Sequence, residues 1–188
     1  LNNFGPDLEN LEHIFRTQKP KYLLLTHLLG FCALSDELLE LCSRYRVSIV
    51  EDCCESHGAE FKGKKVGTHG IASSFSFYYG HHMTTIEGGM ICTNNKKIYE
   101  MSKILRSHGM VRESKNKIFE KRIVNKYKKL SPQFIFLYPT LNFRNNEIGA
   151  TIGINQLKRL DRNIQLRNNN FKFFLKNLNE NIFFKNYD

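Results

Sequence analysis

Residues 22–52 read YLLLTHLLGFCALSDELLELCSRYRVSIVED, and this stretch decides the fold class. The apolar run at 22–26 is typical of a strand buried in a parallel sheet. Ser35, followed by two acidic residues, predicts the start of a helix, and residues 47–50 predict a second strand that ends at Asp52. A strand, a helix and a strand within some thirty residues form a βαβ unit, so the sequence predicts an α/β fold with a parallel sheet.

The rest of the chain continues this pattern. Further strands are predicted at 75–79 and 89–93, a helix at 96–107, a connection with one helical piece at 112–133, and a long helix at 147–179. We expect small residues on one side of the long helix, where another backbone can approach, and apolar anchors along its second half. The small residues are Gly149, Ala150 and Gly153, and the anchors are Leu166, Phe173, Phe174 and Leu178.

The chain has 188 residues and a formal net charge of +10, which is unevenly distributed. Residues 1–90 carry 8 basic and 11 acidic side chains, whereas residues 91–188 carry 20 basic and 7 acidic ones. Such a basic half is typical of a solvated surface, and a site for an anionic small ligand such as a diphosphate is the second interpretation. Nucleic-acid binding would call for a recognised module, and the sequence contains none.

Composition narrows the class of protein further. Hydrophobic residues make up 41% of the chain, an ordinary value that excludes collagen-like and wholly disordered classes. No run of about 18 apolar residues is present, so we expect no membrane span, and the first residues lack the pattern of a signal peptide. The five cysteines contain no C-x-x-C pair and lack zinc-site spacing. We therefore expect reduced thiols, no metal and a cytoplasmic protein.

In an open parallel sheet, ligands bind beyond the carboxyl ends of the strands. Asp52 lies at such an end, where a carboxylate can hold a protonated ring nitrogen; a helix-capping or solvated role is the alternative. His81 and His82 directly follow the predicted strand at 75–79, where a neutral imidazole can move protons near neutral pH; a structural role is the alternative here. Residues 84–89 read TTIEGG, whose glycines permit a tight turn close to a ligand.

Three segments in a fixed order resemble the motifs of one enzyme family. Residues 49–59 read IVEDCCESHGA, residues 75–82 read FSFYYGHH with EGG at 87–89, and residues 141–157 contain LNFR, EIGA and QL. These segments resemble the motifs of the DegT/StrS-like sugar aminotransferases. The resemblance covers nearly the whole chain. It implies the fold type I architecture of enzymes that use pyridoxal 5′-phosphate (PLP), with a mainly parallel sheet and helices on both faces.

The resemblance also implies roles for individual side chains. Asp52 matches the acidic residue that holds the protonated pyridine nitrogen of PLP, which keeps the cofactor an electron sink. Glu55 stands where the family usually has a glutamine near the cofactor ring. Ser76 matches a serine that contacts the cofactor phosphate, and Asn142 matches an asparagine that reaches this phosphate from the partner subunit. A homodimer with shared active sites is therefore implied.

His81 occupies the position of the Schiff-base lysine of the aminotransferases. Histidine has no primary amine and cannot link covalently to PLP, so the chain resembles the sugar 3-dehydratases of deoxysugar and O-antigen biosynthesis, which use the pyridoxamine 5′-phosphate form. The resemblance implies that glutamate donates the amino group and that His81 takes a proton at C4′. The C3 hydroxyl of a nucleotide-linked 4-keto-6-deoxy sugar then leaves, and ammonia is released.

Other functions stay open on the sequence. One is a nucleotide-sugar aminotransferase that uses another lysine, and another is a non-catalytic regulatory protein with this fold. A related group acts on CDP sugars with an iron–sulfur cluster that needs four cysteine ligands, but only Cys92 follows His81. The substrate-binding residues and the nucleotide are not identified.

The resemblance predicts the domain organisation as well. Residues 1–155 correspond to part of the large PLP-binding domain, and residues 156–188 to a helix that leads into a small C-terminal domain whose remainder is absent. The N-terminal phosphate-binding loop of the family is not visible either. We therefore expect the chain to be an internal fragment of a longer enzyme.

Overall fold

The computed structural model describes residues 4–183. The described residues form two compact units, one made of the residues up to Met90 together with those from Glu147 onward, and the other of Ile91–Asn146. Each unit is described by itself. The helix predicted at 147–179 therefore belongs to the same unit as the predicted βαβ segment.

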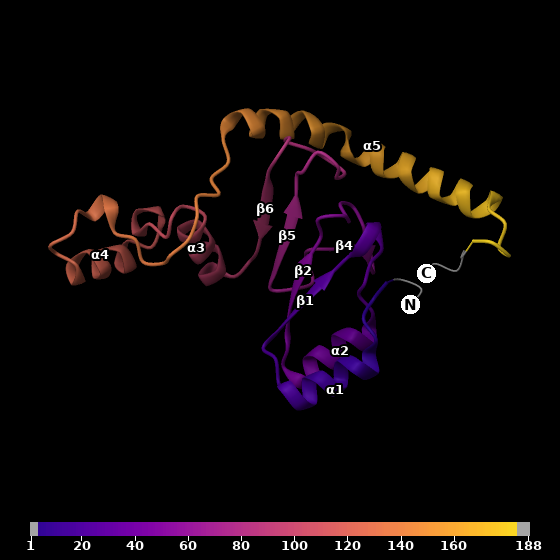
Figure 1. Ribbon diagram of the computed structural model, residues 1–188, viewed down its shortest axis with the longest axis horizontal. Helices are drawn as coiled ribbons and strands as arrows, with labels where there is room; N and C mark the ends of the chain where they lie inside the picture. Colours follow the sequence, from indigo (N-terminus) through magenta and orange to yellow (C-terminus); the bar gives the residue numbers. More distant parts are fainter. Residues whose placement is uncertain (1–3, 184–188) are drawn as a thin grey trace. The chain divides into compact units, whose positions relative to one another are not determined.

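A four-stranded sheet organises the first unit (Figure 1). Across the sheet, the strands follow the order β1 (Tyr22–Thr26), β2 (Ser48–Asp52), β5 (Ala72–Ser76) and β6 (Gly89–Cys92). β1 pairs in parallel with β2, and β2 pairs in parallel with β5, so that Asp52 lies opposite Thr26 on one side and Ser74 on the other. The α/β fold with a mainly parallel sheet is confirmed.

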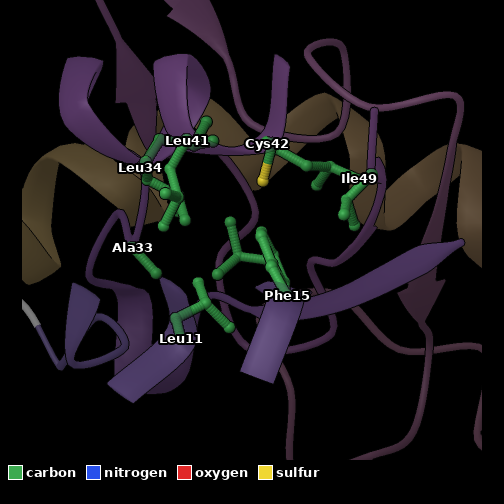
Figure 2. Packing of buried hydrophobic residues seen from close by; sticks show 10 residues of the cluster. Leu11, Phe15, Ala33, Leu34, Leu41, Cys42 and Ile49 are labelled. Atoms are coloured by element: carbon green, nitrogen blue, oxygen red, sulfur yellow. The ribbon is translucent and has the colours of Figure 1, made fainter. Parts of the chain in front are cut away.

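Helices α1 (Leu8–Gln18) and α2 (Asp36–Tyr45) pack against one face of β1 and β2. The side chains of Asp7 and Ser35 accept hydrogen bonds from backbone amides in the first turn of α1 and α2, respectively, which satisfies otherwise unpaired donors. On the opposite face of β1, Leu24 remains 66% exposed. The core between these helices and strands (Figure 2) consists of Leu11, Phe15, Leu25, Ala33, Leu34, Leu38, Leu41, Cys42, Val47 and Ile49.

The prediction of a third strand at 75–79 is wrong, because β5 spans Ala72–Ser76. The Ser76 hydroxyl accepts a hydrogen bond from the Tyr78 amide at 3.2 Å, a local turn that takes the chain out of the strand. The aromatic residues that follow extend the strand-like sequence pattern beyond this turn. His81 and His82 therefore do not directly follow the strand, as the sequence had suggested; a turn separates them from its end.

Most other predicted elements are confirmed, although the sequence did not predict α1 or the short hairpin of β3 (Glu60–Phe61) and β4 (Lys64–Lys65). In the second unit, the predicted helix at 96–107 is α3 (Lys96–Leu105). The helical piece expected within 112–133 is α4 (Lys117–Lys126), which Asn116 caps. Single turns of 3₁₀ helix lie at Leu28–Gly30 in the first unit, and at Val111–Glu113 and Pro132–Phe134 in the second.

The long predicted helix is α5 (Glu147–Asn177), which runs for 31 residues without a break. Gly153 is buried, and a Cβ atom there would lie 3.1 Å from the Thr85 side chain, so a side chain rather than the predicted backbone approaches the helix at this residue. Ala150 is exposed, and so are three of the four predicted anchors, Leu166, Phe173 and Phe174, whereas Leu178 is half-buried. No helix in residues 4–183, α5 included, combines the length and apolar character needed to cross a membrane.

The Glu51 carboxylate, in the middle of this unit, is fully buried. It accepts hydrogen bonds from the amides of Gly67, His69 and Gly70 at 2.6 to 2.8 Å, and it lies 3.1 Å from His27 Nε2. Burial alone would raise the pKa of Glu51, but the hydrogen bonds from His27 and the three amides lower it to about 2. Glu51 is therefore a buried anion that joins the loop after β1 to the loop before β5.

Two residues fix the protonation state of His27. Its Nδ1 accepts a hydrogen bond from the Ala33 amide at 3.1 Å, so this nitrogen carries no proton. The proton lies on Nε2, which donates to Glu51. The geometry therefore favours a neutral imidazole beside an ionised carboxylate.

We expect Glu51→Gln to destabilise the full-length protein by about 3 kcal/mol, because the side-chain NH₂ group would face amide donors in a buried site. Denaturant unfolding followed by circular dichroism measures this loss. In the native protein, the contribution of Glu51 is present above its ordinary pKa of 4.5 and is lost as the pH falls towards about 2. The control is Glu60→Gln, which removes one partner of an exposed pair with Lys65 and should cost less than about 1 kcal/mol. Equal losses for the two variants would contradict this role.

A second prediction concerns the contact of α5 with Gly58, which has φ +90° and where a Cβ atom would overlap the Ile164 side chain. Gly63 also has positive φ, at +73°, but no atom lies near its missing Cβ. Both glycine-to-alanine changes introduce backbone strain of about 1–3 kcal/mol, and Gly58→Ala should cost more because it also displaces α5. Denaturant unfolding measures these losses. Adding Ile164→Ala to Gly58→Ala should recover part of the additional free energy that Gly58→Ala loses compared with Gly63→Ala. Additive losses in the double variant would rule out the steric contact.

Candidate functional site

Asp52 is the last residue of β2 and lies at the carboxyl end of the parallel strands, as predicted. Its Oδ1 accepts hydrogen bonds from the Cys54 amide at 3.1 Å and from the Ser74 hydroxyl at 3.3 Å. Burial alone would raise the pKa of Asp52, but the hydrogen bonds from Cys54 and Ser74 outweigh it and lower the pKa. Both of these bonds go to Oδ1, and the Cys54 thiol also interacts with the carboxylate.

Two serines lie on β5 next to this carboxylate. Ser76, the predicted site residue, ends the strand and accepts the hydrogen bond from Tyr78 that forms the turn. Ser74 lies directly opposite Asp52 across the sheet and donates to it, a role that the sequence analysis missed. Residues two apart on a strand point to the same face. The structure therefore places Ser74 and Ser76 along one line at the carboxyl end of the sheet.

Glu55 follows β2 on the connecting loop, and its carboxylate accepts a hydrogen bond from the Leu29 amide at 2.9 Å. Leu29 has a left-handed backbone, with φ 55°, a conformation that is unfavourable for a leucine and needs support from its surroundings. Glu55 thus holds the loop after β1 against the loop after β2. Its predicted place near a cofactor ring stays a prediction.

Three histidines gather beyond β5: His81 and His82, which the sequence singled out, and His57, which it did not. The His57 ring lies 5.5 Å from that of His82 and 5.4 Å from that of Phe75. All three histidines have buried nitrogens that find no hydrogen-bond partner within residues 4–183: both ring nitrogens of His57 and the Nδ1 atoms of His81 and His82. His57 occurs inside the segment IVEDCCESHGA, so its position in that motif was the available signal.

The electrostatics favour neutral rings at His57 and His82. Burial, then the charges of Arg167 and the neighbouring histidines, lower the pKa of His82 to about 4, although Glu55 raises it. Burial and His81 lower the pKa of His57 as well. At neutral pH these two imidazoles each offer one N–H donor and one lone pair.

A possible metal-binding group lies nearby, but its atoms serve another purpose. Ligand atoms of His27, Glu51 and Cys53 all lie within 4.8 Å of one another. The Glu51 carboxylate already accepts four hydrogen bonds, and Nδ1 of His27 is the acceptor for Ala33. These contacts make the group a structural connection between loops.

Asn142 belongs to the second unit and is exposed. Its Oδ1 accepts two hydrogen bonds from Arg144, one from the backbone amide at 3.2 Å and one from Nε at 3.0 Å. Its backbone forms an isolated bridge with Ser107. The structure therefore brings Asp52, Glu55, Ser76 and His81 into one unit, and the predicted role of Asn142 stays a prediction.

The first unit thus supplies an anion at Asp52, hydroxyl groups on β5 and neutral imidazoles just beyond that strand. Such a set can hold a positively charged heterocycle, bind an anionic group and accept a proton.

The family model of the DegT/DnrJ/EryC1/StrS aminotransferase family matches residues 2–185. A GDP-4-keto-6-deoxy-D-mannose 3-dehydratase of Escherichia coli O55:H7 is 36% identical over 177 residues, which are 93% of this chain and 45% of that enzyme. A GDP-perosamine synthase of Caulobacter vibrioides is 31% identical over 166 residues, 87% of this chain and 39% of that enzyme. The chain therefore spans less than half the length of these relatives.

A solved structure gives the same picture. The E. coli GDP-4-keto-6-deoxy-D-mannose-3-dehydratase with bound hydrated PLP matches with a TM-score of 0.77 and 33% identity, over 93% of this chain and 44% of that one. The fold is therefore that of the PLP-dependent fold type I enzymes, of which these residues form a fragment, as the three motifs predicted. The chain belongs to the DegT/DnrJ/EryC1/StrS aminotransferase family.

Proposed function

We propose that this chain is part of a PLP-dependent 3-dehydratase that acts on a nucleotide-linked 4-keto-6-deoxy sugar. The proposal rests on the family resemblance of residues 75–89, which implies that His81 replaces the cofactor-linked lysine of the aminotransferases. The 36% identity to a GDP-4-keto-6-deoxy-D-mannose 3-dehydratase supports it. In this proposal the amino donor is glutamate, and the product enters deoxysugar and lipopolysaccharide biosynthesis.

The residues at the carboxyl end of the sheet fit PLP. The pKa of Asp52 is lowered, so its carboxylate is ionised at neutral pH and can hold the protonated pyridine nitrogen. The cofactor, in its pyridoxamine phosphate form, supplies an electron sink that takes up the electrons of a broken C–H bond. Ser74 keeps the Asp52 carboxylate oriented through its hydrogen bond.

Other side chains would fix the rest of the cofactor. Ser76 would donate its hydroxyl to the phosphate, and Asn142 of the partner subunit would reach the same group. Glu55, whose carboxylate accepts a hydrogen bond from the Leu29 amide, would place the loop after β2 beside the cofactor ring. These roles need two copies of the chain, so we propose a homodimer that works in the cytoplasm, with neither a membrane nor a nucleic acid as partner.

His81 would hold and move the proton at C4′. Nδ1 of His81 is buried and has no hydrogen-bond partner among the described residues, so it is not committed to a structural contact. Without a primary amine, the side chain forms no lasting covalent link to the cofactor. This combination favours loss of the C3 hydroxyl and release of ammonia over retention of the amino group on the sugar.

The second candidate is a nucleotide-sugar aminotransferase. It is favoured by the relatives named as GDP-perosamine synthases and as UDP-4-amino-4,6-dideoxy-N-acetyl-beta-L-altrosamine transaminases, which are 30–34% identical. Because residue 81 is a histidine, an aminotransferase would need a lysine at another position to link to the cofactor. The two candidates differ in their products, which are a dideoxy sugar with ammonia in one case and an amino sugar in the other.

The full-length protein, given PLP, glutamate and GDP-4-keto-6-deoxymannose, should release ammonia and a sugar that has lost its C3 hydroxyl. His81→Asn should reduce ammonia release by about 100-fold or more, because a general base is lost, while PLP is still retained. The control His13→Asn changes an exposed histidine on α1 and should leave the rate unchanged. A PLP–lysine adduct after borohydride reduction, or an amino-sugar product, would instead establish the aminotransferase.

A further prediction concerns the cofactor. Asp52→Asn should weaken PLP binding by about 10-fold or more, because the charge on the pyridine nitrogen loses its partner. Ser74→Ala should weaken it less, since it removes one of two hydrogen bonds to Oδ1. Absorbance titration of the full-length protein measures both effects, with Asp161→Asn on the exposed surface of α5 as the control. Unchanged affinity in Asp52→Asn would show that the cofactor ring is held elsewhere.

A further inference from the structure

A cavity of about 600 Å³ lies between the loops that follow β1 and β2 and the second half of α5. The site residues Asp52, Ser76 and His81 do not line it. One wall is apolar and aromatic: Leu29 and Phe31 face Ile164, Phe171 and Phe174 of α5. The rings of Phe31 and Phe171 meet edge to face at 5.8 Å, so α5 closes this side of the cavity through a defined contact.

The same face of α5 also carries a positive charge, between Ile164 and Phe171. Arg167 of α5 lines the cavity, and none of the ion pairs among the described residues involves it. Glu60 also lines the cavity, but its carboxylate is 2.7 Å from Lys65 Nζ, which offsets its charge. The cavity is therefore lined by a guanidinium group, that of Arg167, whose N–H donors form no ion pair with a carboxylate of the described residues.

His57 and His82 line the cavity beside Arg167. His57 is only 7% exposed. In the described part of the chain, neither of its ring nitrogens has a hydrogen-bond partner, nor does Nδ1 of His82. Buried polar atoms without partners are costly and uncommon. Burial and the charge of Arg167 lower the pKa of His82 to about 4, so this ring enters the cavity as a neutral donor or acceptor at neutral pH.

We propose that this cavity binds a small carboxylate ligand with an apolar body. Arg167 would form the charged hydrogen bonds to the carboxylate, and the neutral rings of His57 and His82 would supply N–H donors to its remaining lone pairs. The body of the ligand would lie against Phe31, Phe171 and their apolar neighbours. Arg167 is exposed and makes no ion pair among the described residues, so its guanidinium can pair with a carboxylate, which can also accept from the histidine rings.

The probe is 4-fluorobenzoate, which combines a carboxylate with an apolar ring. Fluorine NMR of the full-length protein saturated with PLP should show saturable binding. Arg167→Gln should weaken this binding by at least about 10-fold, while Arg162→Gln, which removes an exposed arginine of the same helix, should not change it. In the unchanged protein, benzoate should displace the probe, and benzyl alcohol at the same concentration should not.

If Arg167→Gln does not fold, the competition between benzoate and benzyl alcohol still tests the proposal, because it uses the unchanged protein. Asp52→Asn should bind the probe normally, so a failed dehydratase assay and a failed cavity assay are separate results. Equal affinity in Arg167→Gln, displacement by benzyl alcohol, displacement by added PLP, or absence of saturable binding would each overturn the proposal.

Discussion

The buried charge of Glu51 is the constraint on which the first unit depends. Its carboxylate is reached by three amides of the 67–70 loop and by His27, so it gathers backbone from segments that are distant in the sequence. An ionised group with no exposure is tolerated only when donors surround it. The loop before β5 and the turn after β1 must therefore keep these positions for the sheet to form as it does.

Consecutive residues on a strand point to opposite faces, and this holds for Glu51 and Asp52, the last two residues of β2. Glu51 is directed to the interior and holds the loops, while Asp52 meets Ser74 and Cys54 at the edge of the sheet. The position of Asp52, the proposed ligand-binding carboxylate, thus follows from that of the structural carboxylate beside it. An acidic pair of this kind separates the task of holding the fold from the task of binding a ligand.

The βαβ unit could be predicted because apolar runs, a helix cap and strand ends are local features, and Asp52 followed from them. The end of β5 could not, because a hydrogen bond between Ser76 and Tyr78 decides it while the aromatic pattern continues. The role of Ser74 could not be predicted, because it depends on the strand pairing that places Ser74 opposite Asp52.

Long-range packing explains the remaining differences. The partners of Glu51 are 16 to 24 residues away, so no local pattern signals them. Phe173 was expected to be an anchor but is 65% exposed, since the contact of α5 goes through Ile164 and Phe171 instead. The roles proposed for His81 and Glu55 come from the family resemblance alone. To these the structure adds a buried His81 nitrogen without a partner among the described residues, and a hydrogen bond from Leu29 to Glu55.

The unbroken course of α5 has a mechanical consequence. Gly153 rests against Thr85 near one end of the helix, and Arg167 lies at the cavity farther along it. At 1.5 Å per residue the two are separated by about 21 Å along one rod. A tilt of about 3° with its pivot at Gly153 would therefore move Arg167 by about 1 Å, enough to lengthen a hydrogen bond beyond its useful range. The contacts of α5 at both places, Gly153 with Thr85 and Phe171 with Phe31, therefore hold the helix against such a tilt.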